Sequence, residues 1–287
     1  MRSRRLLLAA AAACAAAHTV GTLFAHPVWR YAEVCSLALL LVCAAVSRPP
    51  AVSWAVPAAL SLLLVNAVRT IPADPATAGY GWQVHTFRAG DEIDTTSGFE
   101  AGLTACWASL TAVALLLGAW RRGGWRGPTR AGGVVLASLV TGYAVVRIID
   151  VCLALRAESE WYANAIDPAD AVSAVILAVL PALALALTAL ALATALAGHG
   201  RRLASIGAVL LAVASLPLLD GSISAVLLPF GDRTALFTWD AITPTLSMPQ
   251  PVAALTVALE LTAYLLLAAG LTAVRDPTRA APTEPAG

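Results

Sequence analysis

The stretch AVSAVILAVLPALALALTALALATALA, residues 171–197, carries no charged side chain and consists almost entirely of Ala, Leu and Val around Pro181. A bilayer core about 30 Å thick is crossed by roughly 20 mainly apolar helical residues. The stretch exceeds that requirement and is bounded by Asp170 and Gly198. It therefore predicts a transmembrane helix.

Seven further apolar stretches, each bounded by charge, Pro or Gly, meet or approach the same requirement. They are residues 6–25, 31–46, 51–68, 99–120, 132–155, 203–219 and 251–274. Together the eight stretches predict an all-α, polytopic transmembrane helical bundle with about eight spans. We expect residues 1–274 to form a single transmembrane domain and residues 275–287 to form a short, disordered cytoplasmic tail.

The composition agrees with a membrane protein. The chain is 59% hydrophobic and 12% charged, whereas soluble domains are about 45–50% apolar and about 25% charged. A water-soluble fold with this composition could not cover its surface with polar groups. The formal net charge of +1 argues against a nucleic-acid partner, which would need a basic face. The expected partner is the lipid bilayer.

The arginines predict the orientation, because short cytoplasmic segments hold an excess of Lys and Arg. With the first residue inside, the inner segments are 1–5, 47–50, 121–130, 198–202 and 275–287, and their only acids are Asp276 and Glu284. Most acids then lie outside. We expect a multi-pass protein of the cell membrane with both ends in the cytoplasm. The long loops, residues 69–98 and 220–250, are then extracytoplasmic.

Two features of this organisation stay open. Residues 1–17 also fit a cleaved signal peptide, which would leave seven spans, although the apolar run continues to Ala25 and favours a retained span. The two long loops take matching places in the possible halves 1–130 and 131–274. Four spans per half would make these repeats parallel.

The sequence contains none of the common motifs for metal binding, cofactor binding or hydrolytic catalysis. The five cysteines fall in apolar stretches without a C-x-x-C pair, and the four histidines are dispersed. No P-loop, G-x-G-x-x-G, H-E-x-x-H or G-x-S-x-G pattern occurs. We therefore predict no metal site and no cofactor.

Ionisable residues at membrane depth are costly and carry a functional hypothesis by default. Tyr143, Arg147 and Asp150 have the spacing i, i+4, i+7, which puts them on one face of the fifth span. The structural alternative is that Arg147 only neutralises Asp150, or that it clamps Glu260 and fixes helix packing.

The eighth span carries Thr256, Glu260 and Tyr264 on one face, and Glu260 lies close to its middle. His18 reaches a comparable depth in the first span. Glu33, Glu100 and Asp220 lie nearer the outer ends and are expected to be interfacial. The resulting prediction is an outward-facing polar cavity that binds a substrate or a proton, lined by His18, Tyr143, Arg147, Asp150, Glu260 and Tyr264.

Pro217 predicts a bend or an end in the seventh span, after which residues 222–228 would form a short re-entrant or interfacial piece. Three functions fit these patterns. The leading one is a transporter or permease that binds a small solute or a proton in the polar cavity. The alternatives are a non-catalytic membrane subunit, sensor or immunity protein that meets a partner subunit, and an intramembrane enzyme acting on a lipid or isoprenoid.

Overall fold

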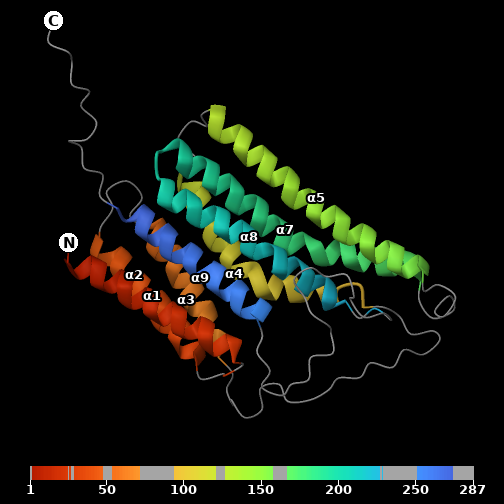
Figure 1. The fold of residues 1–287 in the computed structure, drawn as a ribbon, viewed down its shortest axis with the longest axis horizontal. Coiled ribbons are helices and arrows are strands. Elements are labelled where there is room, and N and C mark those ends of the chain that lie inside the picture. Colours follow the sequence, from red (N-terminus) through yellow and green to blue (C-terminus); the bar gives the residue numbers. More distant parts are fainter. Residues whose placement is uncertain are drawn as a thin grey trace, which may run out of the picture.

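The computed structural model describes residues 2–24, 26, 29–47, 54–71, 94–120, 127–157, 167–226, 228 and 251–273. Their regular structure is α-helical, as predicted, and Figure 1 shows the helices gathered in one bundle. The helices are α1 (Arg2–Leu23), α2 (Arg30–Ser47), α3 (Ala55–Arg69), α4 (Ser97–Trp120), α5 (Gly127–Ala157), α7 (Pro168–Gly198), α8 (Arg202–Ser224) and α9 (Pro251–Leu271). Most of the two long loops and the whole predicted tail lie outside the described residues.

Seven of these helices are long and apolar enough to cross a membrane, by length and composition. The exception is α3, whose 15 residues extend about 22 Å at 1.5 Å per residue. The helical bundle is therefore confirmed, together with seven helices of spanning length. The eighth span, the orientation and the two parallel halves stay predictions.

Of the two outcomes predicted for Pro217, the end of the helix was wrong, and the bend stays a prediction. α8 continues through this proline to Ser224, so residue 220 belongs to a helix and not to a loop. The separate piece predicted for residues 222–228 does not begin at residue 222, because residues 222–224 complete the last turn of α8. A proline removes one backbone hydrogen bond, and packed transmembrane helices tolerate this loss. The correction matters because it places Asp220 inside the bundle.

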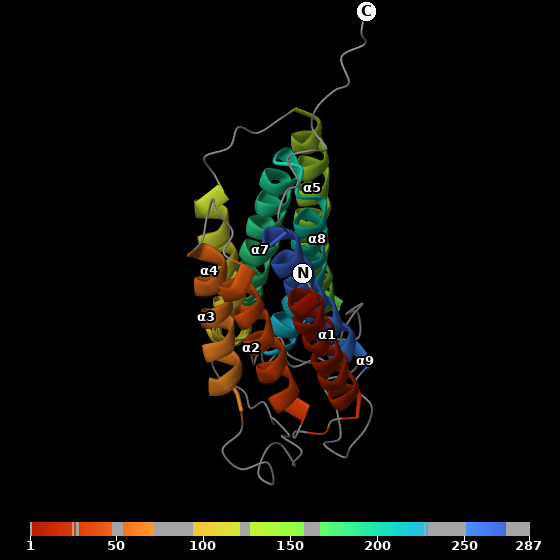
Figure 2. The ribbon, with the colours of Figure 1, turned by 90° about the vertical axis from the view of Figure 1, so that its left-hand side faces the viewer.

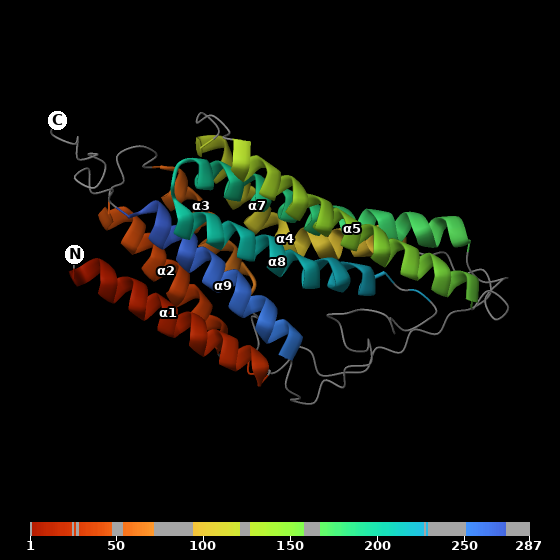
Figure 3. The same ribbon diagram turned by 45° about the horizontal axis from the view of Figure 1, so that its top comes forward.

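The helices pack in an order that differs from their order in the chain. α1, α2, α3 and α4 pack successively, whereas α7 contacts α4, α5 and α8. α9 lies between α8 and α1 (Figure 3). α5 lies along the outside of the bundle (Figures 1 and 2), and its exposed side carries the large apolar residues expected on a lipid-facing helix. Consequently α8 separates α5 from α9.

Small residues allow α8 and α9 to pack closely. A methyl group added to Gly207 on α8 would lie 2.7 Å from the Ala263 carbonyl oxygen on α9. One added to Gly270 on α9 would overlap the backbone of Ala204 on α8. Close backbone approach through glycine and alanine is typical of membrane helices, which gain their packing energy from such contacts.

Arginines bind the carboxyl-terminal end of α9. Arg4 Nη2 donates to the Ala269 carbonyl oxygen at 2.7 Å, and Arg201 Nη1 donates to those of Gly270 and Leu271 at 2.8 and 2.9 Å. The last carbonyls of a helix lack helical partners, and arginine satisfies them. The start of α1, the α7–α8 connection and the end of α9 therefore lie together. This agrees with the predicted grouping of arginine segments on one side.

Candidate functional site

The six predicted site residues fall into two polar clusters on different helices. The arginine cluster consists of Tyr143, Arg147 and Asp150 on α5 with Asp220 on α8. The glutamate cluster consists of Glu260 and Tyr264 on α9, Ser109 on α4, His18 on α1 and Glu33 on α2.

The arginine cluster contains a buried ion pair and a second, partly exposed acid. Arg147 Nε donates to Asp220 Oδ1 at 2.7 Å, and the two side chains are 1% and 0% exposed. Arg147 Nη1 lies 3.3 Å from Asp150 Oδ2, and the Asp150 side chain is 33% exposed. The Tyr143 hydroxyl donates to the second oxygen of Asp220 at 2.6 Å. Both carboxylate oxygens of Asp220 therefore have strong donors.

These contacts correct two predictions. Asp220 is buried and paired, not interfacial, because α8 continues past Pro217. Arg147 takes Asp220 as its partner in place of Glu260. The physical reason is the packing order, since α5 packs against α7 and α8 whereas α9 packs against α8 and α1. The i, i+3 contact between Arg147 and Asp150 is formed, as the sequence suggested.

The glutamate cluster surrounds a carboxyl near the middle of α9. The Ser109 hydroxyl donates to Glu260 Oε1 at 2.9 Å. The Tyr264 hydroxyl lies 2.7 Å from the same oxygen and 2.6 Å from Ser109 Oγ. Its single proton is therefore shared between two acceptors. The i, i+4 spacing of Glu260 and Tyr264 predicted that these side chains share a face, and their contact confirms it.

His18 and Glu33 form the second part of the glutamate cluster. His18 Nδ1 lies 3.0 Å from the Trp29 carbonyl oxygen, which can only accept, so Nδ1 carries a hydrogen. His18 Nε2 faces Glu33 Oε2 at 3.4 Å. One further proton is needed between these two atoms, and it resides either on the ring or on the carboxyl. α1, which carries His18, packs against α9, which carries Glu260.

The two clusters differ in how charge is neutralised. Asp220 has an arginine, whereas none of the ion pairs within the described parts of the chain includes Glu260. Two hydroxyl groups, those of Ser109 and Tyr264, form hydrogen bonds with Glu260. In surroundings of low polarity a carboxyl is neutralised by a cation or by a proton. The glutamate cluster is therefore suited to proton binding.

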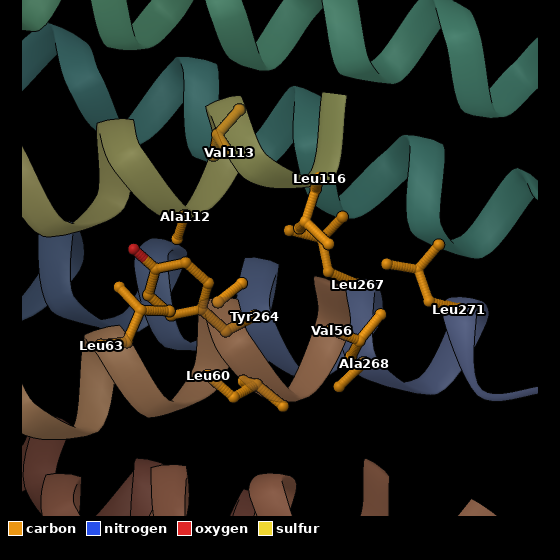
Figure 4. Close-up of a pocket in the computed structure, with 11 residues that line it drawn as sticks. Val56, Leu60, Leu63, Ala112, Val113, Leu116, Tyr264, Leu267, Ala268 and Leu271 are labelled. Atoms are coloured by element: carbon orange, nitrogen blue, oxygen red, sulfur yellow. The ribbon is translucent and has the colours of Figure 1, made fainter. Parts of the chain in front are cut away.

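An apolar cavity adjoins the glutamate cluster between α3, α4 and α9. Its volume is about 20 Å³, room for about one water molecule. Figure 4 shows Tyr264 at one end, with its oxygen pointing away from Leu267 and Leu271. The lining consists of Val56, Ala59, Leu60, Leu63, Ala112, Val113, Leu116, Tyr264, Leu267, Ala268 and Leu271. This cavity is dry in character and differs from the polar cavity expected from the sequence.

Ser109 could not be predicted as a site residue, because an isolated serine in an Ala-rich helix is common and inconspicuous. Glu33 was noticed but assigned to the interface, although it contacts a histidine that is 7% exposed. The predicted position of Asp220 was wrong because the sequence pattern allowed the helix to end at Pro217. Among the described residues no group of His, Cys, Asp and Glu could hold a metal ion.

No protein-family model matches the chain, and the searches of curated proteins and of solved structures found no match either. The fold and composition define the class, which is a multi-helix membrane protein. The function must then be argued from the two clusters.

Proposed function

We propose that this protein is a membrane transporter in which Glu260 binds and releases a proton while a small solute moves. The observation that carries the proposal is the Glu260 carboxyl near the middle of α9, bound by Ser109 and Tyr264 and lacking an ion-pair partner among the described residues. A proton gradient would supply the energy for transport of the solute.

The hydroxyl partners suit a carboxyl that changes its protonation state. A hydroxyl both donates and accepts, so Ser109 and Tyr264 can donate to the carboxylate and one of them can accept from the protonated acid. An arginine only donates, and it therefore stabilises only the ionised form. Both partners of Glu260 can therefore bind the carboxyl in either protonation state, whereas at Asp220 the Tyr143 hydroxyl can do so and the Arg147 guanidinium cannot.

The acids of the glutamate cluster also restrict the solute. Glu260 and Glu33 are the two acids of this cluster. A solute anion placed beside them would be repelled, since like charges in surroundings of low dielectric are strongly unfavourable. The proposal therefore favours a neutral or cationic solute over an anion.

The test uses inverted membrane vesicles that contain the protein and a fluorescent reporter of the pH gradient. The probes are choline, ethidium, spermidine and glucose, added singly after the gradient is established. We expect at least one of them to dissipate the gradient in wild-type vesicles and to have no such effect with Glu260→Gln. The matched control is Glu100→Gln, because Glu100 is an exposed acid in the first turn of α4.

Identical traces for wild type and Glu260→Gln with all four probes would reject the proposal. They would favour the alternative of a non-catalytic membrane subunit, in which Glu260 only joins α9 to α4.

A further inference from the structure

We infer that Ser109, Tyr264 and Glu260 form a proton-operated latch between α4 and α9. A proton on Glu260 holds the two helices together, and when this proton leaves, α4 and α9 separate beside the apolar cavity. The inference rests on the proposed proton-binding role of Glu260 and adds the conformational change that the proton would control.

The hydrogens of the latch can be counted from its three contacts. Glu260 Oε1 lies 2.9 Å from Ser109 Oγ and 2.7 Å from the Tyr264 oxygen, and the two hydroxyl oxygens lie 2.6 Å apart. Each distance is that of an O–H···O hydrogen bond, which needs a hydrogen. The two hydroxyls supply two hydrogens, and a proton on Glu260 supplies the third. Glu260 then donates to Tyr264, Tyr264 to Ser109, and Ser109 to Glu260, so the closed arrangement matches the protonated acid.

Loss of the proton removes one of these three contacts. The proton passes from Glu260 Oε1 to water, and both hydroxyls then donate to the carboxylate. The 2.6 Å contact between Tyr264 and Ser109 is left without its own hydrogen, and two oxygens this close then repel each other. Glu260 and Tyr264 belong to the same helix, so their contact can stay. The change therefore moves Ser109, and α4 with it, away from α9.

An ionised Glu260 also requires water. A carboxylate has about four acceptor sites, and the hydroxyls of Ser109 and Tyr264 fill two of them. The apolar cavity beside Tyr264 has a volume of about 20 Å³ (Figure 4). Separation of α4 from α9 widens this space and admits the water that the carboxylate needs, whereas the protonated acid is satisfied in the closed form.

The packing of the helices permits this separation. The described helices that pack closely against α9 are α8, α1 and α2, whereas α4 packs closely against α7, α3 and α8. α4 meets α9 through the side chains of the latch and of the cavity lining. A contact made by side-chain ends can part without unpacking the backbone of either helix.

α9 keeps a fixed contact with α8 while the latch opens. Gly207 on α8 lies against the Ala263 carbonyl, and Gly270 on α9 lies against the backbone of α8. Arg201 Nη1 also donates to the Gly270 carbonyl at 2.8 Å. These contacts form a seam about which α9 can rotate away from α4 without leaving the bundle.

Other ionisable groups lie on the helices around the latch. They are His18 on α1, Arg30 and Glu33 on α2, Cys106 on α4 and Asp220 on α8. His18 pairs with Glu33 at 3.4 Å, and Asp220 pairs with Arg147 at 2.7 Å. Cys106 donates to a carbonyl of its own helix, and Arg30 donates to the carbonyl that ends α3. A pH response caused by any of these groups would persist when Glu260 is replaced.

The experiment measures the distance between α4 and α9 by pulsed electron paramagnetic resonance on the full-length protein in lipid vesicles. Spin labels are attached to an encoded ketone-bearing amino acid at Ala114 on α4 and Thr262 on α9, both exposed, because the chain has five cysteines. Infrared spectra of the same samples follow the band of the protonated Glu260 carboxyl, identified by its loss in Glu260→Gln. We expect the distance to increase by about 2 Å, the scale of helix shifts in switching proteins, as this band disappears with rising pH. A control pair at Thr262 and the exposed Val20 on α1, which packs against α9, should keep its distance.

Two variants should fix the latch in opposite states. Glu260→Gln keeps a donor and an acceptor at every pH, so the short distance should persist throughout. Ser109→Ala removes the part that α4 contributes, so the long distance should be present throughout. Thr111→Ala removes a hydroxyl from the exposed side of the same helix and should keep the wild-type response. If one of the two latch variants does not fold, the other still tests the inference.

The failure of the latch can be distinguished from the failure of the proposed function. A wild-type distance that stays constant while the Glu260 band disappears would overturn the latch, and so would a pH-dependent distance that persists in Glu260→Gln. Proton-linked transport would stand in both cases if Glu260→Gln abolished the probe-driven gradient changes. A Glu260 band that never changes with pH, together with gradient changes that ignore Glu260→Gln, would remove the proposed function and the latch with it.

Discussion

The arginine cluster and the glutamate cluster place the same kinds of groups at membrane depth and use them differently. Each contains a carboxyl bonded to a tyrosine hydroxyl, at 2.6 Å for Asp220 and 2.7 Å for Glu260. Asp220 also has the buried Arg147 at 2.7 Å, whereas Glu260 has Ser109.

This difference separates a fixed contact from an exchangeable one. Removing one member of a buried ion pair leaves an uncompensated charge, which costs about 3–5 kcal/mol. A carboxyl neutralised by a proton can lose that proton and regain it without leaving any other charge unpaired. The arginine cluster is therefore suited to join α5 to α8, and the glutamate cluster is suited to respond to pH.

The largest expected effect comes from making the same carboxyl-to-amide change in both clusters. Asp220→Asn removes the buried partner of Arg147 and leaves it the partly exposed Asp150 at 3.3 Å, and we expect it to lower the free energy of unfolding by up to about 3–5 kcal/mol. Glu260→Gln replaces a carboxyl that has hydroxyl partners by a neutral amide and should lower this free energy by less than about 1 kcal/mol if Glu260 carries a proton as proposed. Both are measured by denaturant unfolding in detergent micelles.

Equal losses for Asp220→Asn and Glu260→Gln would break the comparison, because both carboxyls would then be ionised and structural. Arg156→Gln, in the last turn of α5 and exposed, serves as the control for loss of a charge outside the clusters.

The next largest effect is a recovery of the free energy of unfolding in a double variant. The double variant Arg147→Met with Asp220→Leu removes both charges and fills similar volume with apolar groups. Replacing a buried ion pair in this way is often neutral or stabilising, so we expect most of the stability lost in Asp220→Asn to return in the same unfolding measurement. The double variant should also retain probe-driven gradient changes, since it leaves the glutamate cluster untouched. Loss of transport would show that the arginine cluster does more than join helices.

Much of the fold followed from the sequence, and less of the site did. Apolar length located α7 to within a few residues because lipid imposes one requirement on every span. Helix spacing correctly put Glu260 and Tyr264 together, since i, i+4 contacts are local. The partners Asp220 and Ser109 depend on which helices are neighbours, and Ala-rich helices with little polar pattern give no information on that.

A smaller effect distinguishes the two tyrosines. Tyr143→Phe and Tyr264→Phe each remove one hydroxyl from a carboxyl, and each should lower the free energy of unfolding by about 1 kcal/mol. Their functional effects should differ. Tyr264→Phe removes a partner that Glu260 needs in both protonation states and should shift the pH dependence of probe-driven gradient changes, whereas Tyr143→Phe should not. A shift of the same size in both variants would contradict the assignment of proton binding to the glutamate cluster.

The smallest expected effect concerns Asp94, whose carboxylate is exposed to water. Comparing Asp94 with the buried Asp220 shows how much burial adds to the stability contributed by a bound carboxylate. Asp94, outside the spanning helices and exposed, accepts from the Thr96 hydroxyl at 2.8 Å and the Thr96 backbone N–H at 2.9 Å. These bonds hold the pKa of Asp94 below its ordinary value. The folded form is then favoured above the ordinary pKa of aspartate, and this advantage disappears as the pH falls through the lowered pKa.

Asp94→Asn should therefore give a small loss of thermal stability at neutral pH that vanishes in acid, measured as the difference in Tm from wild type at each pH. Asp220→Asn should keep its large loss at each pH at which the Asp94 difference is measured, because its partner is a buried arginine that stays charged. If the Asp94 difference were as large as that of Asp220, hydrogen bonding alone would account for the arginine cluster. Burial would then no longer separate the fixed carboxyl from the exchangeable one.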